Sequence, residues 1–145
     1  MQHNSTIWPW NRGIYDPTSE GHFRIEMRCL PSGPTIQDMV MNAGFLLGLT
    51  KGLSYEVNNI IDNLAFKYAS YNFYQAAEFG LNAQFIWPNK NGVLAEIPVT
   101  KLLDRMLDLS AFGLQQLGAS QQEIIMMQKC IRARYKNNMT GAIWQ

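Results

Sequence analysis

The sequence predicts an α+β fold: a short antiparallel β element over residues 1–34, followed by a mainly helical body over residues 35–145 with one small hairpin. Two observations carry this prediction. Apolar and charged residues alternate over 23–29, which is typical of a half-buried strand. From Thr35 onward, apolar residues recur at helical spacing, and two helix-start signals mark where helices begin. A chain of 145 residues is the size of one domain, so we expect a single domain.

The front of the chain predicts two strands. Residues 6–10 (TIWPW) are aromatic and β-leaning, and Pro9 confines them to an edge or an irregular strand. Residues 13–21 (GIYDPTSEG) are rich in turn formers, residues 23–29 alternate, and the prolines of residues 31–34 end the run. Two strands around such a loop form either a hairpin or neighbouring strands of a larger sheet.

The first helix is predicted to begin after Thr35, which suits an N-cap because Asp38 follows three residues later. Nearly all faces of this segment are apolar, so we expect a central helix. Gly44, Gly48 and Gly52 recur every four residues on it, a spacing that favours close packing against another helix rather than a phosphate loop.

The rest of the body is predicted as helices around a hairpin. Residues 58–79 are helical and divide near Ala69, and Asn91-Gly92 supplies positive φ for a hairpin of residues 83–87 and 93–97. Pro98 suits the first helical position before residues 99–117, which Gly118 ends. Ser120 and Glu123 form a capping box for a helix over residues 121–136, and the closing MTGAIWQ is turn-like.

Composition excludes several classes of function. The net charge is +1 and the basic residues are scattered, so we expect no nucleic-acid partner. No apolar run is long enough to span a bilayer, and the first residues lack the pattern of a signal peptide. Cys29 and Cys130 form no CxxC pair, which argues against a disulfide framework or a thiolate zinc site. We therefore expect a reduced, cytoplasmic protein.

Most charged residues have a structural explanation. His3 and His22 are the only histidines, and their spacing to other residues suggests no catalytic arrangement. The carboxylates and cations near the start of the fourth predicted helical segment fit a solvated face with weak ion pairs. The cations at the end of the last long helix suit the helix macrodipole. The group on the solvated face is Lys101, Asp104, Arg105 and Asp108. The group at the end of the last long helix is Arg132, Arg134 and Lys136.

The strand residues Arg24, Glu26 and Arg28 are the unusual feature. Alternate side chains of a strand share a face, so the three charges form a row about 6–7 Å apart per step. One interpretation is a self-neutralising charge ladder on a solvated face. The other is a site in which guanidinium groups grip phosphate or carboxylate oxygens and the carboxylate binds Mg²⁺. Spacing alone favours neither.

Longer motifs add a resemblance. RIEMR (residues 24–28) resembles the R-I-E-x-R active-site strand of the glutamine synthetase superfamily, although the Pro-Asp and Asn-Pro-Tyr pattern of the glutamine synthetases themselves is missing. Four other stretches resemble the C-terminal part of bacterial glutamate–cysteine ligase-like proteins, in the carboxylate–amine ligase branch of that superfamily. These stretches are STIWPWNRG, LPSGPT, YNFYQAAEFGLNAQFIWP and TGAIWQ. The resemblance covers nearly the whole chain and implies that the β element is part of a glutamine synthetase-like sheet.

The resemblance implies a role for each charged residue. Such ligases activate a carboxylate with ATP and Mg²⁺ so that an amine can attack it. By position, Glu26 corresponds to a Mg²⁺-binding glutamate, and Arg28 to the arginine that holds substrate carboxylate or γ-phosphate. Arg24 corresponds to a contact with nucleotide phosphate, so Arg28 and Arg24 are the candidate catalytic residues. Arg12, in the WNR stretch, is a further candidate phosphate contact.

The sequence also departs from the family. Before Arg24 the only acidic residues are Asp16 and Glu20, both predicted to lie in a turn, so the further metal ligands of such enzymes have no counterpart. We therefore expect the C-terminal portion of a longer ligase, inactive alone, whose partners are small carboxylate and amine substrates. The alternative is a non-catalytic α+β interaction module that self-associates through its β edges into a homo-oligomer.

Overall fold

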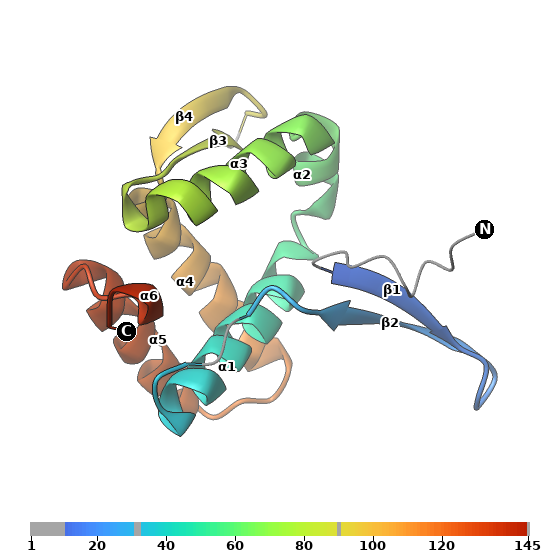
Figure 1. Ribbon diagram of the computed structural model, residues 1–145. Helices are drawn as coiled ribbons and strands as arrows, with labels where there is room; N and C mark the ends of the chain where they lie inside the picture. The colour runs from blue at the N-terminus through green and yellow to red at the C-terminus, as the bar shows by residue number, and fades with distance from the viewer. Residues whose placement is uncertain (1–10, 31–32, 90, 145) are drawn as a thin grey trace. The chain divides into compact units, whose positions relative to one another are not determined.

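The computed structural model describes residues 11–30, 33–89 and 91–144, and contacts within the chain divide it into two units, Met1–Gly33 and Pro34–Gln145. The first unit contributes a two-stranded antiparallel sheet. The second contains the helices and another two-stranded antiparallel sheet (Figure 1). The predicted α+β class is confirmed. No helix in the described part of the chain is long and apolar enough to cross a membrane.

The first unit is a hairpin of β1 (Asn11–Asp16) and β2 (His22–Met27). The predicted hairpin is therefore present, but its first strand covers residues that the sequence assigned to the turn. The turn is shorter than predicted because Ser19, Glu20 and Gly21 all adopt positive φ, which reverses the chain within a few residues. The strand predicted over residues 6–10 lies outside the described residues.

The core of the second unit lies among three helices, α1 (Ile36–Leu53), α4 (Val99–Gln116) and α5 (Gln121–Lys136). Helices α1 and α4 make the most extensive contact in the chain and lie side by side in Figure 1. The buried residues at the centre come from α4 and α5, and partly buried residues of α1 pack against them. The buried cluster consists of Leu107, Met127, Ile131 and Tyr135.

Glycines allow α1 and α4 to approach until their backbones touch. A Cβ atom on Gly113 of α4 would lie 1.9 Å from the carbonyl oxygen of Gly48 on α1, and one on Gly52 would lie 2.2 Å from that of Leu109. Between these glycines, the fully buried Ser110 hydroxyl donates to the Phe45 carbonyl at 2.9 Å. The predicted close packing is confirmed at Gly48 and Gly52.

Both predicted capping boxes are present. The Thr35 hydroxyl accepts from the Asp38 backbone N–H at 3.1 Å, and the Asp38 carboxylate accepts from the Thr35 backbone N–H at 3.2 Å. Ser120 and Glu123 make the same exchange at the start of α5, which covers the residues predicted for it. Each box satisfies N–H groups that the first helical turn leaves unpaired.

The remaining elements form a second layer: α2 (Val57–Asn63), α3 (Phe66–Phe79), the 3₁₀ turn η1 (Gly80–Asn82) and the hairpin of β3 (Gln84–Pro88) and β4 (Leu94–Pro98). Helix α3 packs along β3. The buried Asn72 of α3 joins them, because its amide both donates to and accepts from the Ile86 backbone at 2.8 Å.

Several boundaries differ from prediction. The helical region predicted over residues 58–79 divides at Leu64, not near Ala69, because Leu64 leaves helical geometry with ψ 88°. Pro98 is the N-cap of α4, with ψ 132°, rather than its first helical residue. Gly92 of the predicted Asn91-Gly92 pair has a positive φ of 76°. The tail predicted as turn-like contains a short helix, α6 (Gly141–Trp144).

Charged residues expected on a solvated face or at a helix end also connect elements that are distant in the sequence. Arg105 of α4 pairs with Glu56 at 2.6 Å, and Asp104 accepts the hydroxyl hydrogen bond of the buried Tyr135 on α5. Arg134 of α5 pairs with Asp38 of α1 at 2.7 Å. The spacing of charges within one helix can indicate only partners on the same helix. It could not predict these pairs, because they join residues far apart in the sequence.

Substituting Gly113 by Ala should break the α1–α4 contact. The new methyl group would overlap the Gly48 backbone, so we expect a loss of about 3 kcal/mol or more in the free energy of unfolding. Gly44→Ala is the matched control: its Cβ meets only Met127 at 3.9 Å, and it should stabilise the helix by about 0.5–1 kcal/mol. Urea denaturation followed by circular dichroism measures both changes, and equal effects would contradict the packing argument.

Candidate functional site

The candidate site is the charged face of the β1–β2 hairpin. The register sets Arg12 opposite Glu26 and Asp16 opposite His22, and directly opposed residues of an antiparallel pair share a face. Arg24 lies opposite Ile14 on the same face. Strand β2 ends at Met27, so Arg28 follows the strand rather than lying on it, but its guanidinium reaches back to Glu26. Of the four residues predicted from the sequence, Arg12, Arg24 and Glu26 therefore lie on this hairpin, and Arg28 follows directly after it.

Glu26 is the centre of the first of two clusters on this face. Arg28 holds its carboxylate with a hydrogen bond from Nη2 to Oε2 and an ion pair between Nε and Oε1, both 3.0 Å. The Nε of Arg12 donates to Oε2 as well. These hydrogen bonds, first those from Arg28 and then those from Arg12, lower the pKa of Glu26 below its ordinary value of 4.5. The carboxylate is therefore ionised at neutral pH.

Asp16 is the centre of the second cluster. It pairs with Arg24 at 3.0 Å and lies 4.0 Å from the His22 ring, and hydrogen bonds from Thr18 lower its pKa. The sequence prediction missed Asp16 and His22 as members of the face because it assigned Asp16 to the turn. If β1 is taken to reach residue 16, the alternation of side chains along the strand places Asp16 on the same face as Arg12 and Ile14.

Charge and exposure differ between the two clusters. The face carries three arginines and two carboxylates, so it has a positive excess of one charge with His22 neutral. The Arg28 side chain is only 14% exposed, whereas that of Arg24 is 58% exposed. Arg24 is thus the guanidinium most open to an anion from solution, and Arg28 is the one most firmly held in place.

The opposite face of the hairpin is apolar and open to solvent. Tyr15 is 59% exposed, Phe23 81% and Ile25 65%. The rings of Tyr15 and Phe23 lie 5.3 Å apart, centroid to centroid, and so support each other across the strands. A hairpin with one charged and one apolar face has the pattern of strands from a larger sheet with one side packed on a core.

The face fits phosphate better than it fits a bare metal ion. Guanidinium groups bind phosphate and carboxylate oxygens in a bidentate manner. No three His, Cys, Asp or Glu side chains gather as a metal site among the residues that the structure describes. Mg²⁺ is, however, commonly bound by one or two carboxylates together with substrate phosphates. The hydrogen bonds from Arg12 and Arg28 end on Oε2 of Glu26, whereas Oε1 lies in the ion pair with Arg28, so Oε1 is the oxygen better placed for such a shared ion.

Comparison of the chain with protein-family models, with curated proteins and with solved structures gives no match. The ligase family therefore stays a prediction from the quoted sequence motifs.

The arginines should control the titration of Glu26. Its folded pKa is lowered, so the pairing stabilises the hairpin above the ordinary pKa, and this stability is lost as the pH falls through the folded pKa. Carbon-13 NMR of the side-chain carboxyl should show a midpoint below 4.5 in the wild-type chain. Arg28→Gln should raise this midpoint more than Arg12→Gln, because Arg28 supplies the larger contribution.

Arg132→Gln is the control for this titration, because Arg132 lies on α5 and forms its ion pair with Asp104, 3.9 Å away, rather than with Glu26. A wild-type midpoint at the ordinary value, or one that Arg28→Gln leaves unchanged, would contradict the described pairing.

Proposed function

We propose that this chain contributes the charged face of β1–β2 to the active site of an ATP-dependent carboxylate–amine ligase of the glutamate–cysteine ligase-like type. The observation that supports this most is the Glu26 carboxylate fixed between Arg12 and Arg28 on one face. Small carboxylate and amine molecules are the proposed substrates, and the cytoplasm is the proposed location.

Each charged residue has a proposed task. Arg28, held by its hydrogen bond and ion pair to Glu26, orients the substrate carboxylate or the terminal phosphate. Arg24 and Arg12 bind nucleotide phosphate, and Glu26 is one ligand of Mg²⁺ bound with ATP. When bound, Mg–ATP supplies the phosphoryl group that activates the carboxylate. Fixed guanidinium groups stabilise negative charge at the transferred phosphoryl because they need no reorganisation during the reaction.

The exposed apolar face supports a composite site. Phe23 and Ile25 expose most of their surface on a hairpin whose strands pair only with each other among the described residues. Additional strands and a covering layer would bury this surface, and with it about 1.5–3 kcal/mol for each large apolar side chain. We propose that the remaining metal and substrate ligands come with those strands, and that this chain alone has no ligase activity.

Arg28→Ala tests the proposal in a protein that carries the whole site. ADP release that depends on both an acid and an amine should fall by about 10²–10³-fold, the usual effect of removing a donor aimed at developing charge. Arg28→Lys should recover only part of the activity, because an ammonium group lacks the bidentate geometry. Arg132→Ala is the matched control on α5. Unchanged turnover in Arg28→Ala would rule out the assignment.

A second candidate function is self-association through the hairpin. The same exposed apolar face and the unpaired strand edges favour it, because such edges pair readily with another copy. Light scattering of the isolated chain should then show a dimer or a larger species that Phe23→Ser and Ile25→Thr together disperse. A monodisperse wild-type monomer would contradict this candidate.

A further inference from the structure

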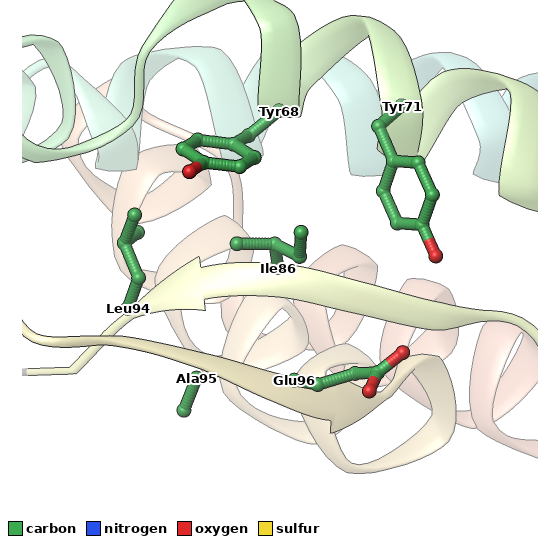
Figure 2. Close-up of a pocket in the computed structure, with 6 residues that line it drawn as sticks. All are labelled: Tyr68, Tyr71, Ile86, Leu94, Ala95 and Glu96. Atoms are coloured by element: carbon green, nitrogen blue, oxygen red, sulfur yellow. The ribbon is translucent and has the colours of Figure 1, made fainter.

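A concave surface lies in the unit of residues 34–145, between α3 and the β3–β4 hairpin. It is an open groove of about 540 Å³, within the size range of small-molecule sites. Figure 2 shows Tyr68 and Tyr71 projecting from α3 toward the hairpin, with Ile86 and Leu94 below Tyr68. The carboxylate of Glu96 lies on the side of Tyr71, and Ala95 points away from α3.

The walls of the groove are fixed by the fold. Tyr68 and Tyr71 are three residues apart on α3, so they share one face of the helix. The buried Asn72 holds α3 to β3 through both polar groups of the Ile86 backbone. Ile86 lies directly opposite Glu96 in the hairpin register, so their side chains share the sheet face that carries the groove.

The charges of the groove are unbalanced. Within the part of the chain that the structure describes, no cation pairs with Glu96, and its side chain is exposed. Lys67 precedes Tyr68 on α3, and its ammonium lies 4.8 Å from the centre of the Tyr68 ring. No described cation lies over the ring of Tyr71, which is 40% exposed. An unpaired carboxylate and an open aromatic ring therefore line the same groove.

We propose that this groove binds an organic cation, a primary or quaternary ammonium group carried on a short apolar chain or ring. The cation lies between the Glu96 carboxylate and the Tyr71 ring, which attract it through its charge and through the ring quadrupole. The apolar part lies over Ile86 and Leu94. The groove fits an amine better than an anion or a neutral ligand, because Glu96 is the one charged residue that lines it among the described residues.

This site does not depend on the proposed ligase function. Its residues lie on α3, β3 and β4, and none belongs to the hairpin of β1 and β2. The amine that it recognises can come from a free small molecule or from a lysine side chain of a polypeptide. The shared chemistry is the alkylammonium group, and the choice of probes separates the two sources.

Titration of the whole chain with phenethylammonium, followed by nitrogen-15 NMR, tests the proposal. The backbone signals of Tyr71 and Glu96 should shift in a saturable way. The neutral analogue 2-phenylethanol should bind about fivefold more weakly, which corresponds to roughly 1 kcal/mol. Nα-acetyl-lysine amide is the third probe: tighter binding of this compound than of phenethylammonium supports a polypeptide source, and the reverse supports a small amine.

Three variants make the test specific. Glu96→Gln keeps the size of an exposed side chain and should remove the preference for the ammonium over the alcohol. Tyr71→Leu should weaken ammonium binding about threefold, whereas Tyr71→Phe should keep it, because the ring rather than the hydroxyl attracts the cation. Glu78→Gln, on α3 but outside the groove lining, is the matched control. Equal binding of amine and alcohol, or an undiminished preference in Glu96→Gln, would overturn the proposal.

Discussion

The body of this protein depends on the contact between the α1 and α4 backbones. Gly48, Gly52 and Gly113 leave no space for a Cβ atom where the helices cross, and the buried Ser110 hydroxyl bonds to the α1 backbone at the same place. This approach brings α1 and α4 together with α5 around Leu107 and Met127, so the core is closed by helices rather than by a sheet. Close backbone approach restricts the geometry strongly, because interiors packed at crystal-like density tolerate little extra volume.

The β1–β2 hairpin is organised by a different constraint, the compensation of charge. Glu26 pairs with Arg12 and Arg28, and Asp16 with Arg24, so the carboxylates offset arginines that would otherwise repel one another on one narrow face. The same pairing holds Arg28 in a defined position before any substrate binds. The same side chains can therefore act as a charge ladder and as a phosphate site. The carboxylates hold the guanidinium groups in fixed positions, and an anion or a metal-bound phosphate can bind to guanidinium N–H groups that the carboxylates do not engage.

Local signals in the sequence predicted much of this fold. The Thr35 and Ser120 capping boxes, the glycine spacing on α1 and the alternation of β2 each depend on residues only a few positions apart. What could not be predicted depends on distant partners: Arg134 with Asp38, Arg105 with Glu56, and Asn72 with the Ile86 backbone. In the site, Arg24, Glu26 and Arg28 could be grouped from the alternation in the sequence, and Arg12 from the family resemblance alone. Asp16 could not, because its place on the face follows from a register set by the left-handed turn at residues 19–21.

The most direct test of the charged face as a phosphate site is calorimetry of ATP binding, with and without Mg²⁺, to the wild-type chain and to Glu26→Gln. If Glu26 is a ligand of metal-bound ATP, removing its charge weakens binding of Mg–ATP. The same change strengthens binding of metal-free ATP, since Arg12 and Arg28 are released from their internal partner. Opposite shifts are the result that this account predicts. Parallel shifts would contradict it and leave the face as a charge ladder.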